Sequence, residues 1–161
     1  MNKKKVKEIM TTPAITCDSA TSIIEAIKIM KKKNIGFMPI TKNNLLIGVI
    51  TDRDILMRME NSESLYEPIE KITITSEIHF VNPETSLVDA AKIMSKNKIR
   101  RLVVLNDGKV IGVLTSKNIC KEKDLLPYII ETYTEILTLP EYLMYTNSNP
   151  HDSVKTSDYP L

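Results

Sequence analysis

The sequence predicts an α+β fold in which two tandem β-α-β-β-α repeats pack about a pseudo-twofold axis, followed by a C-terminal helix and tail. First, the stretch Gly48–Asp54 (GVITDRD) recurs as Gly112–Asn118 (GVLTSKN). Second, the offset of 64 residues between these two glycines holds without gaps back to Thr21, which falls on Thr85. Third, short β-rich runs alternate with amphipathic helical patterns in each copy. Two copies are too few for a solenoid, so we expect two like units packed face to face.

The first repeat is assigned to residues 6–60 and begins with an irregular lead that includes a short extended piece at 14–16. A helix is expected from Ser22 to about Lys33, because Ser22 and Glu25 have the spacing of a capping box. Its apolar face consists of Ile23, Ile24, Ile27 and Met30. The elements expected next are a strand at 37–40, a turn at 43–44, a strand at 45–50 and a helix at 52–59.

Two residues of the first repeat have a predictable local role. Pro39 lacks a ladder donor, so it must lie at a sheet edge or beside an irregularity. Thr51 is placed to cap the helix that follows it, and Asp54, three residues later, completes a capping box. Thr115 and Asn118 have the same spacing in the second copy.

A polar segment without periodicity, residues 61–71, is assigned as the linker to the second repeat, residues 72–122. The second repeat is expected to contain an extended lead at 78–81, a helix starting at 83–86, strands at 101–105 and 110–114, and a last helix after 115. Its two strands are joined by a strong hairpin signal, Asn106-Asp107-Gly108. Residues 123–161 are assigned to an amphipathic helix, from Asp124 to Leu137, and a loosely ordered tail.

Composition narrows the classes of function. The net charge of +2 argues against nucleic acid as the main partner. No apolar run approaches the roughly 20 residues needed to cross a bilayer. The two cysteines, Cys17 and Cys120, lie far apart and favour a reducing, cytoplasmic location. No metal site is expected, because neither His79 nor His151 has carboxylates or thiols at ligand spacing.

The element order and the doubled motif Gly-hydrophobic-X-Thr-X-X-Asp/Asn resemble the tandem CBS-domain module, also called the Bateman module. The resemblance extends from about Ile9 to Cys120. It implies an α+β module whose central cleft holds an adenosine ligand such as AMP, ADP, ATP or S-adenosylmethionine. It also implies that each site takes its Thr and Asp or Asn from one repeat and most of its base-facing wall from the other.

This resemblance implies two candidate ligand sites. The first contains Val113, Thr115, Asn118, Arg100 and Arg101, faced by Ile15, Ile35 and Gly36. The second contains Val49, Thr51 and Asp54, faced by His79, Ile99 and Arg100. A hydroxyl at a helix start can hydrogen-bond to a phosphate, and a carboxylate or amide oxygen one turn later can bind a ribose diol. The first repeat has Gly36-Phe37 where the second has Arg100-Arg101, so we expect phosphate at the site built on Thr115.

The expected function is a stand-alone regulatory or energy-sensing module that binds an adenosine nucleotide and performs no catalysis. The sequence has no Ser-His-Asp ordering, P-loop or GxGxxG motif, and no base and nucleophile at matched spacing. No cofactor is expected besides this ligand. One alternative is a ligand-free structural or interaction scaffold in which Thr51 and Thr115 only cap helices. Another is the regulatory subunit of an unidentified enzyme or transporter. Only some forty residues lie outside the repeats, which argues against a complete second domain in this sequence.

The expected partners are the adenosyl ligand, a regulated protein of unidentified class and a second copy of the chain. We expect a homodimer because the second helix of each repeat carries apolar residues that its own sheet does not obviously cover. These residues are Ile55, Leu56, Met59 and Ile119. In the family that the chain resembles, these helices pack between subunits, and closed twofold assembly is the commonest oligomer.

Overall fold

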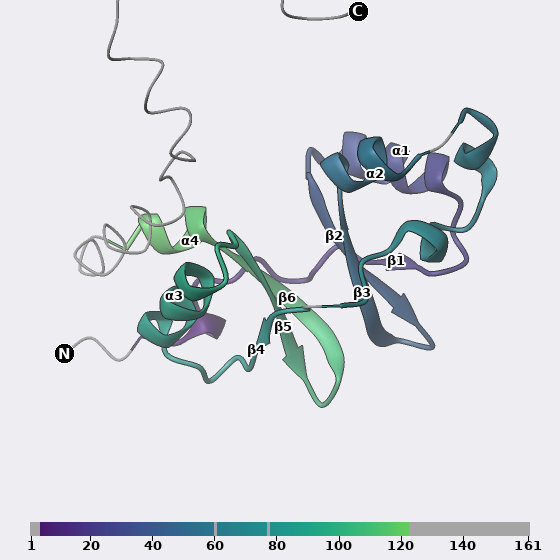
Figure 1. Cartoon of the computed structure of the whole chain (residues 1–161). Coiled ribbons are helices and arrows are strands. Elements are labelled where there is room, and N and C mark those ends of the chain that lie inside the picture. Colours follow the sequence, from purple (N-terminus) through teal and green to yellow (C-terminus); the bar gives the residue numbers. More distant parts are fainter. Residues whose placement is uncertain (1–3, 60, 77, 123–161) are drawn as a thin grey trace, which may run out of the picture.

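The computed structural model describes residues 4–59, 61–76 and 78–122, with each repeat forming a three-stranded sheet and two α-helices (Figure 1). Repeat 1 contains β1 (Cys17–Asp18), α1 (Ile23–Lys33), β2 (Phe37–Lys42), β3 (Leu45–Thr51) and α2 (Asp52–Arg58). Repeat 2 contains β4 (Phe80–Val81), α3 (Leu87–Lys96), β5 (Arg101–Asn106), β6 (Lys109–Thr115) and α4 (Ser116–Cys120). The α+β class and the β-α-β-β-α order are thereby confirmed. The predicted C-terminal helix and tail lie outside the described residues.

The two sheets have the same topology and the same register. Their orders are β1-β2-β3 and β4-β5-β6, with the first pair parallel and the second antiparallel. The antiparallel pairing places Phe37 opposite Thr51 in repeat 1 and Arg101 opposite Thr115 in repeat 2. Both pairs also contain a register shift at equivalent positions. Residues that lie 64 positions apart in the sequence therefore occupy equivalent places in the two sheets.

Pro39 lies in the middle strand of its sheet and not at an edge. Pro39 instead lies beside an irregularity, because the register of β2 against β3 shifts between Ile40 and Thr41. β1 pairs with β2 only from Ile40 onward, so no ladder donor is needed at Pro39. The extended lead also differs from the expectation, since the strand lies at Cys17–Asp18 and not at 14–16.

The predicted turns are confirmed. Asn43 and Asn44 have φ angles of 53° and 64°, and Asp107 and Gly108 have φ angles of 48° and 75°. Two successive positive φ angles are characteristic of a type I′ hairpin turn, which matches the twist of the flanking strands. Asn34, with φ of 51°, ends α1 in the left-handed conformation.

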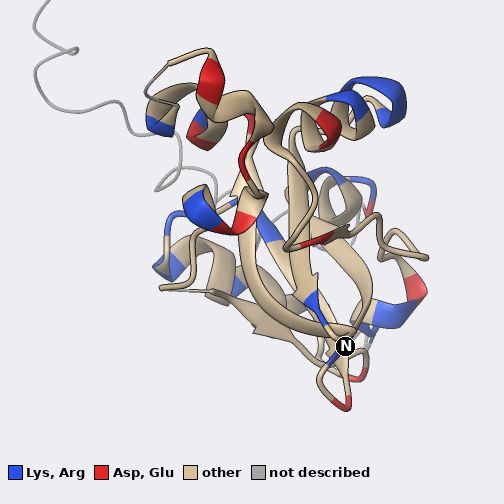
Figure 2. Cartoon of the chain, turned by 90° about the vertical axis from the view of Figure 1, so that its right-hand side faces the viewer, with Lys and Arg blue, Asp and Glu red and all other residues tan. Residues whose placement is uncertain are grey.

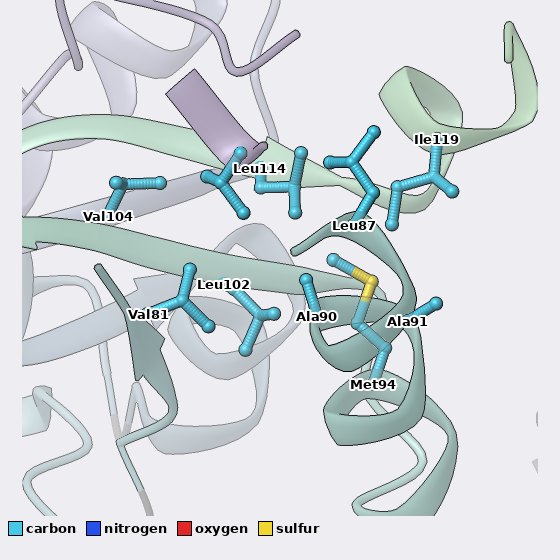
Figure 3. Packing of buried hydrophobic residues seen from close by; sticks show 10 residues of the cluster. Val81, Leu87, Ala90, Ala91, Met94, Leu102, Val104, Leu114 and Ile119 are labelled. Carbon is cyan, nitrogen blue, oxygen red and sulfur yellow. The ribbon is translucent and has the colours of Figure 1, made fainter. Parts of the chain in front are cut away.

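Each repeat has its own hydrophobic core between its helices and its sheet. In repeat 2, α3 packs its apolar face against β5, β6 and α4 (Figure 3). The buried side chains in this view include Leu87, Ala90, Met94, Leu102, Leu114 and Ile119. Ile55 and Ile119 are each 3% exposed inside these cores, so the expectation that they form a surface between subunits is wrong. Of the other residues expected on this surface, Leu56 is 75% exposed and Met59 is partly buried; Met57, which was not expected there, is also 75% exposed.

The segment that precedes each repeat packs against the other repeat. Val6, from the 3₁₀ helix η1 (Val6–Glu8), is fully buried in the core of repeat 2. Ile69, from η3 (Ile69–Ile72), is fully buried in the core of repeat 1. Residues 61–71, the expected linker, thus contain part of η3 and also η2 (Glu63–Tyr66). This exchange ties the repeats together from both sides.

Two backbone bridges extend the exchange along the strands. Thr11 pairs with Val113 of β6 through N–H···O distances of 2.9 and 3.0 Å. Val49 of β3 pairs with Ile74 at the same two distances. The second bridge requires Gly48, because a Cβ atom there would lie 2.6 Å from the carbonyl oxygen of Ile74.

An ion-pair cluster fixes η1 against repeat 2. The carboxylate of Glu84 accepts hydrogen bonds from Lys5 and Lys7, each at 2.6 Å. These hydrogen bonds lower the pKa of Glu84 to about 2 and raise the pKa of Lys7. Because the folded-state pKa of Glu84 is depressed from 4.5, its contribution to stability is complete above pH 4.5 and is lost as the pH falls toward 2.

We therefore expect Glu84→Gln to reduce stability at neutral pH, by a small amount because the group is exposed. The difference from the unmodified protein should vanish as the pH falls through that window, and it should shrink in high salt. Urea denaturation at several pH values measures it. A deficit that stays constant down to pH 2 would contradict the ion-pair interpretation.

Charged side chains of both signs are interspersed over the two repeats (Figure 2). Within the described part of the chain, no helix combines the length and apolar character that a bilayer span needs. In the same residues, no group of three or more His, Cys, Asp and Glu side chains is placed to hold a metal ion.

Candidate functional site

A cavity of about 360 Å³ lies between the two repeats. Its walls come from the N-terminal lead (Thr11, Ala14, Ile15), the turn from α1 into the first residue of β2 (residues 34–37) and repeat 2 (Arg100, Arg101, Val113, residues 115–117). Its volume is at the low end of the roughly 300–1,000 Å³ typical of small-molecule sites. The bridge from Thr11 to Val113 brings the N-terminal lead to β6, and the pairing of β5 with β6 sets Arg101 opposite Thr115.

The structure brings together seven of the eight residues expected in the first site. Arg100, Arg101, Val113, Thr115, Ile15, Ile35 and Gly36 all line the cavity. Asn118 does not, because its side chain is engaged with Thr115 at the start of α4. The backbone N–H of Thr115 donates to Asn118 Oδ1 at 2.9 Å, and the N–H of Asn118 donates to Thr115 Oγ1 at 3.2 Å.

Both threonines cap their helices, as the sequence predicts. Thr51 and Asp54 form the equivalent capping box, with the same two contacts at 2.9 and 3.1 Å. In each box the threonine hydroxyl also donates to the side-chain oxygen three residues later, at 2.5 Å for Asp54 and 2.6 Å for Asn118. The capping interpretation is thus correct for both, while Thr115 additionally lines the cavity.

Three cationic side chains line this cavity: Arg100, Arg101 and Lys117. The guanidinium carbon of Arg101 lies 5.6 Å from the ring centroid of Phe37, which is a cation–π distance. Burial and then the neighbouring Arg100 lower the pKa of Arg101, while the charge of Asp52 opposes this shift. Arginine stays protonated in proteins, so at least the two guanidinium groups of this lining suit an anionic ligand.

The remaining wall is largely apolar. Ala14, Ile15, Ile35 and Val113 contribute aliphatic surface, and Gly36 contributes only its backbone. Asp52 packs against the α-carbon of Gly36, because an added Cβ would meet Asp52 Oδ2 at 2.6 Å. The cavity therefore combines an apolar wall with three positive charges, an arrangement that suits a flat ring bearing an anionic group.

The residues expected only in the second, separate site do not line this cavity. Val49, Thr51, Asp54, His79 and Ile99 are all absent from its lining. Val49 is held in the backbone bridge to Ile74, and the carbonyl oxygen of His79 accepts the N–H of Val103 at 3.3 Å. Arg100, which we expected in both sites, lies at the first one.

Sequence reasoning did not place several lining residues in the site. These are Thr11, Ala14, Asn34, Phe37, Ser116 and Lys117. Ser116 and Lys117 directly follow Thr115 in the repeated motif, so the motif itself is a signal for them. Thr11 has no such signal, because its place depends on a bridge to a residue about a hundred positions away.

A family model described as "CBS domain" matches residues 6–61 and, separately, residues 69–124. The chain belongs to the CBS-domain family. Among curated CBS relatives, YhcV of Bacillus subtilis is 33% identical over 110 residues, which are 68% of this chain and 78% of that protein. MJ1225 of Methanocaldococcus jannaschii is 35% identical over 117 residues, but this chain spans only 41% of its length.

Two solved CBS structures resemble this one and contain ligands. The CBS domain pair of MJ0100, in complex with 5′-methylthioadenosine and S-adenosyl-L-methionine, is 32% identical with a TM-score of 0.66. The match covers 74% of this chain and 95% of that one. CBSX2 in complex with AMP is 27% identical with a TM-score of 0.65, covering 76% and 98% of the two chains. These likenesses establish the CBS-pair fold.

Proposed function

We propose that this CBS pair is a regulatory module that binds one adenosine nucleotide between its repeats and performs no catalysis. The observation that carries the proposal is the cavity, in which an apolar wall and three cationic side chains meet. The adenosyl ligands of the MJ0100 pair and CBSX2 support the ligand class.

A phosphate-bearing ligand such as AMP fits the charges of the cavity better than uncharged adenosine. In this proposal Arg100, Arg101 and Lys117 bind the phosphate, since charge-assisted hydrogen bonds from arginine to phosphate are strong and directional. Ile15, Ile35 and Val113 contact the base, and Gly36 leaves room beside it. Asn118 does not line the cavity and is given no ligand contact in this proposal; its side chain holds Thr115 through the capping box.

Such a ligand would act by stabilising one arrangement of the repeats. The cavity is lined by the N-terminal lead, repeat 1 and repeat 2, so a bound molecule contacts all three at once. A ligand shifts a conformational equilibrium only by its difference in affinity for the two states. Because the site is shared among three segments, a change in their arrangement would change its affinity, and we expect the relative position of the repeats to be the signal to the regulated protein.

Thermal unfolding tests the proposed function. AMP should raise the melting temperature, because a ligand that binds only the native state stabilises it by about 2.7 kcal/mol at a hundredfold excess over the dissociation constant. Native mass spectrometry of protein purified from cells should show the mass of a co-purified adenosyl ligand. If AMP, ADP, ATP and S-adenosylmethionine all leave the melting temperature unchanged, a ligand-free scaffold is the better interpretation.

We also propose a homodimer, with α2 as its interface. Leu56 and Met57 are exposed on α2, and Leu56 itself lines a groove with residues of α1, of α2 and of the turn at 34–36, among them Ile27 and Met30. A twofold axis across α2 would pack these two side chains of each copy against the groove of the other. Antiparallel packing would also bring the acidic first residue of α2, Asp52, near Arg58 at the end of the partner helix.

Leu56→Glu should therefore weaken the dimer. A buried hot-spot side chain contributes about 2 kcal/mol or more, so the dissociation constant should rise roughly thirtyfold or more. Light scattering across a concentration series measures this. Tyr66→Glu, at a residue 79% exposed outside α1 and α2, is the matched control and should leave the mass unchanged. A monomeric mass for the unmodified protein at tens of micromolar would overturn the proposal.

A further inference from the structure

Phe37 and Arg101 are equivalent residues of the two repeats, and their side chains contact each other. They lie 64 positions apart in the sequence, and each is the first residue of the middle strand of its sheet. Each also lies opposite the threonine that caps the next helix, Thr51 for Phe37 and Thr115 for Arg101. Two equivalent residues can meet only close to the pseudo-twofold axis, so this pair joins the two repeats at the cavity that both residues line.

The two side chains are complementary because repeat 1 has an aromatic ring where repeat 2 has a cation. The guanidinium carbon of Arg101 lies 5.6 Å from the centroid of the Phe37 ring, within the range of a cation–π contact. A second arginine at position 37 would instead place two positive charges next to each other. The ring therefore attracts the guanidinium at the place where the two repeats meet.

The ring holds Arg101 without neutralising it. Arg101 is partly buried, and within residues 4–59, 61–76 and 78–122 none of the ion pairs includes it. A carboxylate partner would cancel its charge and engage the N–H donors that a phosphate needs. An aromatic ring has no formal charge, so the positive charge of Arg101 stays available to an anionic group in the cavity.

We propose that Phe37 is a positioning residue that holds Arg101 in place for the phosphate of an adenosine nucleotide and thereby sets the preference for AMP over adenosine. A free arginine side chain samples many rotamers, which a ligand must restrict when it binds. A guanidinium already held by the ring loses less of this freedom, so the phosphate contact becomes stronger. The inference rests on the proposed function, since it assumes that the cavity binds such a ligand.

Calorimetric titration of the full chain with AMP and with adenosine tests the inference. Phe37→Leu keeps an apolar side chain but removes the ring, so the ratio of AMP affinity to adenosine affinity should fall by about three- to tenfold. The fall should be smaller than for Arg101→Ala, because the guanidinium is still present. Phe37→Tyr retains an aromatic face and should keep the ratio within about twofold of the unmodified protein.

A double-mutant cycle separates positioning of Arg101 from a purely structural role. If Phe37 acts through Arg101, Phe37→Leu should cause no further fall in the ratio once Arg101 has been replaced by alanine. Phe80→Leu is the matched control, because Phe80 is the other phenylalanine of the chain, is 57% exposed and does not line the cavity. The same substitution there should leave both affinities unchanged.

The inference is overturned if Phe37→Leu leaves the ratio unchanged, whether the two affinities stay the same or fall together. A common fall would place the ring against the base. An equal fall in the ratio with and without Arg101 would also overturn it. An unmodified protein that binds AMP no more tightly than adenosine contradicts the phosphate contact and this inference, and one that binds neither contradicts the proposed function as well.

Discussion

Ile69→Ala should lower the free energy of unfolding by about 2–5 kcal/mol, the usual cost of truncating a buried isoleucine to alanine. Ile69 lies within the segment 61–71 that the sequence suggests is a linker, yet its side chain is 0% exposed in the core of repeat 1. Its backbone N–H also bonds to the carbonyl oxygen of Thr21 at 2.8 Å, just before α1. The loss should thus equal that of a core strand residue such as Ile50.

Chemical denaturation measures this loss, and Tyr66→Ala provides the control. Tyr66 lies three residues earlier in the same segment but is 79% exposed, so its truncation should change stability by no more than about 0.5 kcal/mol. If Ile69→Ala were as mild as this control, η3 would not belong to the core of repeat 1. The exchange of lead segments between the repeats would then be refuted.

Arg101→Ala should weaken AMP by roughly ten- to a hundredfold, since a hydrogen bond to a charged group contributes about 1.5–3 kcal/mol. Adenosine lacks the phosphate, so its affinity should change by only about threefold through the lost packing on Phe37. Calorimetric titration with both ligands separates these effects, because the packing loss is common to both. The ratio of the two changes therefore reports the phosphate contact alone.

Arg53→Ala is the matched control for this experiment. It also removes a positive charge, but Arg53 is exposed on α2 and does not line the cavity. Asp54→Ala should likewise leave AMP binding at the cavity nearly unchanged, apart from the stability lost with its capping box. Equal losses of AMP and adenosine affinity on Arg101→Ala would contradict the proposal that Arg101 contacts the phosphate.

The repeat made most of the fold predictable from the sequence. Local signals were sufficient for the turns at Asn43-Asn44 and Asp107-Gly108 and for the caps at Thr51 and Thr115. Each depends on residues within three or four positions of one another, so the sequence contains the whole interaction. The resemblance to the CBS module implied eight residues for the first site, and seven of them line the cavity.

Long-range packing is what the sequence did not reveal. Ile55 and Ile119 looked like an uncovered face, because a pattern on one helix does not show which neighbouring element buries it. The bridge from Thr11 to Val113 joins segments about a hundred residues apart and has no local signature. Each of these features depends on tertiary contacts.

Amide chemical shifts during a titration with AMP test the central claim most directly, because they report where the ligand binds on each segment of the chain. We predict saturable shifts at Thr11, Ile15, Phe37, Arg101 and Thr115, which lie on separate segments around one cavity and do not line the α1–α2 groove. Shifts should be much smaller at the equivalent positions around Thr51. A titration that perturbs neither set, or only residues of the α1–α2 groove, would contradict a nucleotide site between the repeats.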